Sequence, residues 1–370
     1  MQPNLIAMAV PMFFAGMLVE LGVAKAKGKQ VYRLGDAISD MGCGVTQQLV
    51  SLFLATGVLL GGYDWLYQHR FFTIPTTWLP WVVAVFGVEF AYYWWHRLSH
   101  EVNLLWAAHV VHHHSEDYNL AVALRQSITT WATTIPFYFP FALLGVPTVC
   151  FGVVLGLSTL YQFWIHTELI PSLGWFEKWF NTPALHRVHH AINQRYLDKN
   201  HSATFSFYDR MFGTWEPETE PCIYGTTRPI NSFNPLYAQF ETYWDLIKLA
   251  GRAPTLKDKF KVFFASPAWR EPWMGDFVKR DISNKYNPEA SRGTKMYVLI
   301  SWLIVLGGMG AFLNWGNDLS GWSKAGIAVV VVMSTVSLPS LIEGKSWSKA
   351  LEGARLLALP ALAALLLIVH

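Results

Sequence analysis

Histidines gather in three short motifs of this chain, and their spacing is that of metal ligands. The motifs are His96-Arg-Leu-Ser-His100, His109-Val-Val-His112-His113-His114 and His186-Arg-Val-His189-His190. Ten of the 13 histidines lie within residues 96–114 and 186–201. Imidazole is the commonest metal-ligating side chain near neutral pH. The sequence therefore predicts an ordered metal site.

Helical spacing turns these motifs into candidate ligand sets, because residues three or four positions apart share one face of an α-helix. Eight imidazoles can converge in this way: His96, His100, His109, His112, His113, His186, His189 and His190. A structural zinc ion takes four ligands and a catalytic one takes three, so eight histidines suit two ions. Imidazole binds zinc, copper, iron and nickel alike, which leaves the metal open. The role of His114 is also open, since a helix directs it about 100° away from His113.

The composition indicates an integral membrane protein. Apolar residues make up 52% of the chain and charged residues only 14%, against roughly 25% charged in a soluble domain. Eight apolar segments approach the ~20 residues that cross a bilayer: 4–24, 45–62, 77–95, 128–143, 147–166, 296–314, 323–341 and 355–369. The net charge of +3 gives no indication of nucleic-acid binding, and the three cysteines form no paired motif. We expect an all-α integral membrane protein, built as a multi-span helical bundle.

The histidine motifs divide this bundle into three expected parts. Residues 1–166 hold the N-terminal transmembrane helices and the first histidine motifs, 167–295 form a cap with the third motif, and 296–370 form C-terminal transmembrane helices. Lysine and arginine follow the first span closely, at Lys25, Lys27, Lys29 and Arg33. The positive-inside rule then places the N-terminus outside and the histidine-rich helical cap in the cytoplasm.

Two further features of the chain leave alternatives open. Trp175/Trp179 and Phe176/Phe180 repeat at i, i+4 and predict either a helix in the membrane interface or a core helix. Glu89 lies inside a predicted span, ~10 Å along the helix axis from His96. An ionisable residue there is usually functional. It could orient the metal ligands or line a channel to them, or it could bond a neighbouring helix.

Several chemistries suit a histidine-rich site at a membrane. Zinc could hydrolyse a lipid ester, whereas iron could activate dioxygen and attack a C–H bond. A metal transporter and a membrane protein with structural zinc are alternatives of another class. A transporter holds its ligands near the middle of the membrane, whereas these motifs lie at helix ends.

The order of the motifs is similar to that of the fatty acid hydroxylase and sterol desaturase superfamily. The strings His113-His-Ser-Glu-Asp-Tyr-Asn-Leu120, Ala123-Leu-Arg-Gln-Ser127 and Trp164-Ile-His-Thr-Glu168 resemble the branch that cleaves alkylglycerol ether lipids. This resemblance implies a di-iron monooxygenase that uses O2 and an external electron donor to hydroxylate a C–H bond of a membrane lipid. Ether cleavage would release a fatty aldehyde. Animal members suggest tetrahydrobiopterin as reductant, and hydroxylation or desaturation of a fatty acyl chain or sterol is the alternative.

The same resemblance assigns residue roles. It implies that the eight histidines are iron ligands and adds His166 as a ninth. It also marks six polar residues that orient ligands or face the substrate: Glu116, Arg125, Glu168, Asn193, Asp198 and Asn200. Glu168 and Asp198 are the expected acceptors of histidine N–H groups, with helix capping and turn formation as the alternative role for these six residues. His201 stands where relatives often have an aromatic residue, as a further ligand or a packing group.

Overall fold

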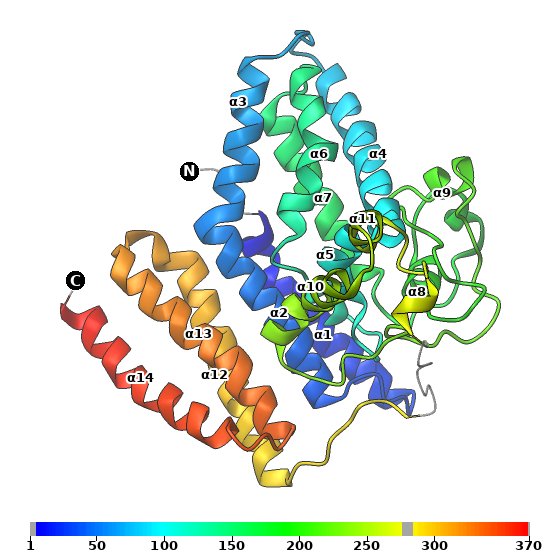
Figure 1. The fold of residues 1–370 in the computed structure, drawn as a ribbon. Coiled ribbons are helices and arrows are strands. Elements are labelled where there is room, and N and C mark those ends of the chain that lie inside the picture. Colours follow the sequence, from blue (N-terminus) through cyan, green and yellow to red (C-terminus); the bar gives the residue numbers. More distant parts are fainter. Residues whose placement is uncertain (1–4, 276–283, 369–370) are drawn as a thin grey trace.

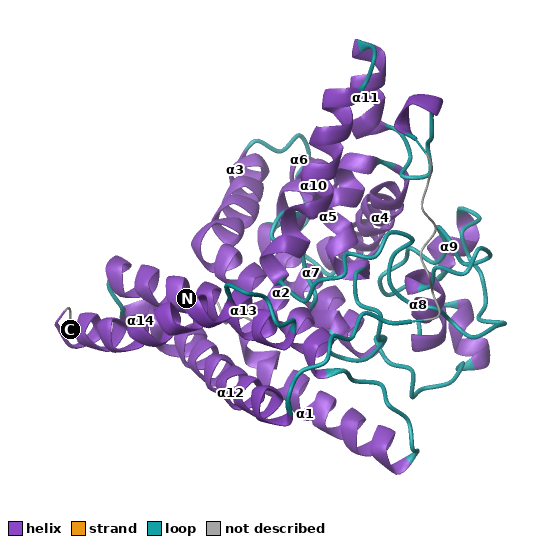
Figure 2. Ribbon diagram, turned by 60° about the horizontal axis from the view of Figure 1, so that its bottom comes forward, coloured by secondary structure: helices purple, strands orange, loops and turns teal. Residues whose placement is uncertain are grey.

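A computed structural model describes residues 5–275 and 284–368, which fold into helices and connecting loops without a strand (Figures 1 and 2). The predicted all-α fold is thus confirmed for this part of the chain. The first half contains α1 (Leu5–Ala26), α2 (Leu34–Val50), α3 (Gly62–Gln68), α4 (Leu79–Glu101), α5 (Asn103–His113), α6 (Thr130–Leu143) and α7 (Thr148–Trp164). The second half contains α8 (Pro183–His190), α9 (Phe207–Met211), α10 (Pro235–Arg252), α11 (Leu256–Phe264), α12 (Arg292–Trp315), α13 (Gly321–Ile342) and α14 (Ser348–Ile368).

Within the described residues, fewer helices qualify as candidate membrane spans than the eight segments that the sequence predicts. Three helical segments are long and apolar enough to cross a bilayer, namely Ala9–Ala26, Arg292–Trp315 and Gly321–Ile342. A fourth span results if Leu34–Ala55 and Gly57–Gln68, which meet at a bend of 40°, count as one. The predicted segments 77–95, 128–143, 147–166 and 355–369 are helical over most of their length, as α4, α6, α7 and α14, but do not pass as single spans. Residues 4 and 369 of the predicted spans and residues 276–283 of the predicted cap lie outside the described residues.

Helices α3, α4, α6 and α7 form one bundle (Figure 1). Its core is aromatic and aliphatic: Tyr63 stacks on Phe151 with ring centroids 4.0 Å apart, and Val88 and Tyr138 complete the packing. Gly145 makes the tight turn between α6 and α7 with a φ of 93°, a conformation that favours glycine. This bundle carries α4 down to the histidine region, where the chain turns into α5.

Helices α12, α13 and α14 lie together and pack against α2 through a second core (Figures 1 and 2). Ile38 of α2 meets Trp302, Phe312 and Leu338 there, and all four side chains are buried. The chain between α7 and α10 is mostly loop and surrounds the short helices α8 and α9.

The predicted helix around Trp175 is wrong in extent. Only a 3-10 turn forms, at Gly174–Lys178. The helix does not continue beyond this turn. The Asn181 backbone N–H instead donates to Thr204 O at 2.8 Å, and Thr182 caps the next helix, α8. Trp175 and Trp179 are exposed, whereas Phe176 stacks on Phe180 with ring centroids 4.6 Å apart.

Candidate metal centre

Nine buried histidines converge in two neighbouring groups, and they are the nine that the sequence and the resemblance pick out. The five-histidine group consists of His96, His100, His109, His113 and His189, and the four-histidine group of His112, His166, His186 and His190. Within each group the candidate ligand atoms lie within 4.8 Å of one another. Sites of this composition suit two metal ions.

Two short helices supply histidines to both groups. In α5, His109 and His113 share one face and join the five-histidine group, whereas His112, ~100° around the helix, joins the other. In α8 the i, i+4 pair His186 and His190 joins the four-histidine group, whereas His189 joins the five-histidine group. The two groups are therefore adjacent, because α5 and α8 lie between them.

The start of α8 is fixed by local sequence. Pro183 occupies its first turn, where a missing N–H costs nothing. Thr182 precedes it in an extended conformation, and its side chain accepts from the Leu185 backbone N–H at 3.4 Å. This cap sets the rotation of an eight-residue helix whose residues are all buried.

Main-chain carbonyls orient four of the rings. The Nδ1 atoms of His96, His112, His166 and His189 lie 2.7–3.0 Å from the carbonyl oxygens of His201, Arg125, Gln162 and Lys199. A carbonyl oxygen only accepts, so each of these Nδ1 atoms carries the hydrogen. The Nε2 atom of each ring is then a bare lone pair that faces its group.

The pair His112 and His166 shows what this arrangement requires. Both rings donate through Nδ1, yet their Nε2 atoms lie 3.2 Å apart. Two lone pairs cannot form a hydrogen bond with each other. In the described part of the chain, Nε2 of His100, His189 and His190 is buried without any partner. A bound cation satisfies such nitrogens, so the donor set fits metal ions.

The protonation states agree with metal binding. Burial lowers the pKa of His112 to about 4 and that of His189 to about 3. Both rings are therefore neutral at pH 7. The neutral imidazole is the form that ligates metal ions.

Comparison with known proteins agrees with this geometry. The family model for fatty acid hydroxylase matches residues 81–214, which include all nine histidines. The alkylglycerol monooxygenase of Homo sapiens is 40% identical over 314 residues, which cover 82% of this chain and 70% of that protein. The alkylglycerol monooxygenase of Danio rerio is 36% identical over 363 residues, which cover 95% and 80%. The chain belongs to the fatty acid hydroxylase family.

Two further comparisons gave a weaker match and no match. An ornithine lipid hydroxylase of Rhizobium tropici is 28% identical over 153 residues, which cover 38% of this chain and 43% of that protein. No solved structure matches the chain. Membership of this family confirms the predicted resemblance and the predicted oxygenase. The protein is thus an integral membrane enzyme of an iron-dependent class that uses O2, which disfavours the transporter and structural-zinc alternatives.

The two carboxylates expected to accept histidine N–H groups do not do so in this family member. Asp198 Oδ1 lies 3.8 Å from His100 Nδ1, beyond hydrogen-bonding distance, and its side chain is 58% exposed. Within residues 5–275 and 284–368, no hydrogen bond joins Glu168 to a histidine ring. Main-chain carbonyls take this role instead. The carbonyls of Lys199 and His201, from one loop, and of Arg125 lie within hydrogen-bonding distance of the Nδ1 atoms of the rings.

Arg125 and Asn200 hold elements that carry ligands. Buried Arg125 donates through Nε to Val111 O at 2.6 Å and through Nη1 to Asp40 Oδ1 at 3.0 Å, while its carbonyl orients His112. Asn200 adopts a φ of 55° and donates from Nδ2 to Leu185 O in α8 at 2.9 Å. Both side chains therefore position histidines.

Glu116 and Asn193 contact the main chain away from the rings. Glu116 Oε2 accepts from the Tyr286 backbone N–H at 2.6 Å. Asn193 donates to Pro221 O at 3.0 Å and accepts from the Ile223 N–H at 2.9 Å. Both side chains thus connect loop segments through hydrogen bonds to their main chain. A role of either residue toward the substrate stays a prediction.

His114 and His201 join neither group. The His201 ring is fully buried with its centroid 5.1 Å from that of His100, and neither ring nitrogen has a partner among the described residues. Its main chain does contribute, since its carbonyl orients His96 at 2.7 Å. No residue type or spacing predicts this contact, because every residue has a main-chain carbonyl.

Glu89 bonds neighbouring elements and not the histidines. Its carboxylate accepts from Ser158 Oγ of α7 at 2.6 Å and from the backbone N–H and the hydroxyl of Thr204, each at 2.8 Å. These contacts agree with the alternative in which Glu89 bonds a neighbouring helix. Glu89 thereby joins α4 to α7 and to the loop that contains Thr204.

We expect Glu89→Gln to lower stability while the metal content stays unchanged. The amide cannot accept from both Thr204 donors and Ser158, so one buried donor loses its partner, at a cost of about 1–3 kcal/mol. Thermal unfolding in detergent and iron analysis of the same preparation measure the two quantities. A variant with unchanged unfolding temperature but lost iron would make Glu89 part of the metal centre.

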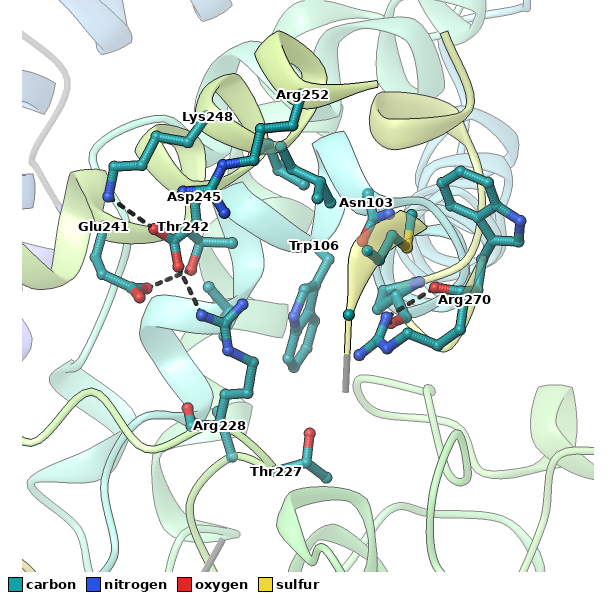
Figure 3. Close-up of a pocket in the computed structure, with 18 of the residues that line it drawn as sticks. Asn103, Trp106, Thr227, Arg228, Glu241, Thr242, Asp245, Lys248, Arg252 and Arg270 are labelled. Carbon is teal, nitrogen blue, oxygen red and sulfur yellow. Dashed lines mark hydrogen bonds and ion pairs between the residues drawn. The ribbon is translucent and has the colours of Figure 1, made fainter. Parts of the chain in front are cut away.

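A cavity of about 520 Å³ opens beside the five-histidine group, between α5, α10 and the loops at 226–228 and 267–275 (Figure 3). Trp106 stands in its middle, and the ring centroid of Trp106 lies 5.0 Å from that of His100. Charged side chains surround the indole: Arg228, Glu241, Asp245, Lys248, Arg252 and Arg270. Trp106 therefore lines the polar cavity and also contacts His100 of the five-histidine group.

Proposed function

We propose that this membrane lipid monooxygenase holds one iron ion in each histidine group and cleaves alkylglycerol ether lipids. Two observations support the proposal together: the five-plus-four sorting of the histidines, and the alkylglycerol monooxygenases that match 82–95% of the chain. When bound, iron would supply the activation of O2 that inserts one oxygen atom into a C–H bond beside the ether oxygen.

The balanced reaction needs an external electron donor. The ether carbon is oxidised to a hemiacetal, one oxygen atom of O2 enters the product, and the other leaves as water after two electrons and two protons arrive. The hemiacetal then breaks its C–O bond to give a fatty aldehyde and glycerol. We propose a tetrahydrobiopterin-type reductant for the two electrons, in keeping with the resemblance.

The residues of the chain hold this chemistry in place. The nine imidazoles offer nitrogen ligands, and the carbonyls of Arg125, Lys199 and His201 fix three of the rings so that little reorganisation is needed. The basic residues Lys25, Lys27 and Lys29 after α1 favour a cytoplasmic location for the centre, where a soluble reductant can reach it.

Hydroxylation of another membrane lipid is the second candidate. The match to a bacterial ornithine lipid hydroxylase favours it, because that protein resembles this chain over 153 residues while its product is a hydroxylated lipid. The choice between the two depends on which carbon lies next to the centre.

The test is a product analysis with matched lipids. The protein is purified without oxygen, loaded with ferrous iron and supplied with O2 and tetrahydrobiopterin, together with either a 1-O-alkylglycerol or the 1-acylglycerol of equal chain length. We expect fatty aldehyde from the ether only, and none from protein loaded with zinc, which is redox-inert. Equal consumption of both lipids without aldehyde would favour the second candidate.

A further inference from the structure

Helices α10 and α11 expose apolar faces that nothing in the described chain covers. On α10, Tyr237, Phe240, Trp244 and Ile247 are 49–58% exposed. On α11, Leu256, Phe260 and Phe264 are 50–83% exposed. These positions recur at three- and four-residue intervals, so each set lies along one side of its helix. Exposed apolar patches of this kind mark interaction surfaces.

Other sides of the two helices are already occupied. Leu246 of α10 and Val262 of α11 pack with Ala107 of α5, and all three are buried. A further side of α10 is charged and lines the cavity of Figure 3 with Glu241, Asp245, Lys248 and Arg252. The hairpin is thus anchored to the histidine-bearing helix α5 and has a separate apolar side and a separate charged side.

Basic residues border the apolar faces. Five lysines and arginines against three acidic residues occur within 235–264. Lys257 and Lys259 are exposed and flank the apolar side of α11. Lys248 places its ammonium group 5.7 Å from the ring centre of Trp244, so its stem follows the indole while its charge lies toward the polar side. This pattern is typical of helices at the boundary between water and anionic lipid.

The direction of the hairpin agrees with that location. In Figure 1, α10 and α11 point toward the viewer, whereas α3, α4 and α6 run along the vertical of the view. In the turned view of Figure 2, α11 projects at the top of the molecule, beyond α3, α4 and α6. Because α3 belongs to the bent candidate span, a hairpin that crosses its direction fits a position along a membrane surface.

We propose that the α10–α11 hairpin lies in the membrane–water interface, with its apolar faces among the acyl chains of an anionic leaflet and its charged side in water. The partner is a lipid surface. The charged cavity beside Trp106 then opens at the level of the headgroups, next to the metal centre.

The depth of single labels in a bilayer tests this proposal without reference to activity. The whole protein is placed in lipid nanodiscs, in a Cys222→Ser background, since Cys43 and Cys150 are buried. A nitroxide is attached to Phe240→Cys or Phe260→Cys on the apolar faces, and to Arg252→Cys on the charged side as the matched control. Collision rates with O2, which concentrates in lipid, and with a water-soluble nickel chelate give the depth.

We expect several-fold higher O2 accessibility and several-fold lower nickel accessibility at positions 240 and 260 than at 252. Adding phosphatidylglycerol to phosphatidylcholine discs should increase this difference, and Lys257→Gln/Lys259→Gln should remove the increase. Equal nickel accessibility at all three positions would overturn the proposal. So would labels that are immobilised and accessible to neither reagent, because a second copy of the chain would then cover the face.

Discussion

His113→Ala should abolish turnover, with a loss of at least ~100-fold, whereas His114→Ala should leave most of the activity. The two histidines are neighbours in the chain, both are buried, and both substitutions delete the same atoms. Only His113 belongs to a histidine group, where its Nε2 lies 3.1 Å from that of His109. The difference between the variants therefore isolates metal ligation from the loss of a buried side chain.

Iron content provides the second readout for this pair. We expect His113→Ala to bind less iron than the unaltered protein and His114→Ala to bind the same amount. If both variants lost iron equally, the assignment of His113 to the five-histidine group and of His114 to neither group would be wrong.

Arg125→Met should lower the free energy of unfolding by about 3–5 kcal/mol, because it leaves a buried carboxylate without its partner. The side chains of Arg125 and Asp40 are 1% and 0% exposed and lie 3.0 Å apart. The same substitution removes the bond from Arg125 Nε to Val111 O, next to His112. The four-histidine group should therefore also lose iron affinity. Chemical unfolding in detergent and iron titration measure the two effects.

The double variant Asp40→Asn/Arg125→Met is the control for this second prediction. It removes the uncompensated charge, so it should regain part of the lost stability. It should not regain the iron affinity, because the tie between residue 125 and Val111 is still absent. A single variant as stable as the unaltered protein would contradict the role of this pair.

The ligand set was predictable because helical spacing is a local property. The i, i+4 pairs His96/His100, His109/His113 and His186/His190 each enter one group together, and all eight histidines predicted from spacing enter the two groups. Their division between the groups was not predictable. His112 and His113 are adjacent in the chain yet belong to different groups, because His166, beyond the end of α7, and His190 of α8 approach α5 on the side of His112.

The groups that orient the rings could not be read from side-chain types. Residue types favour carboxylates as partners of histidine N–H groups, which points to Glu168 and Asp198. The observed acceptors are the carbonyls of residues 125, 162, 199 and 201, whose positions depend on how loops pass behind the rings. The difference in candidate spans has another cause. Helices α6 and α7 have only 14 and 17 residues, fewer than the ~20 that cross a bilayer, because Gly145 and the residues that follow Trp164 end them early.

Anomalous X-ray scattering at the iron edge, from crystals of the iron-loaded protein, tests the central claim most directly. We predict two peaks, one among the Nε2 atoms of the five-histidine group and one within the four-histidine group. A single peak, or a peak ligated by His114, Asp198 or Glu168, would contradict it.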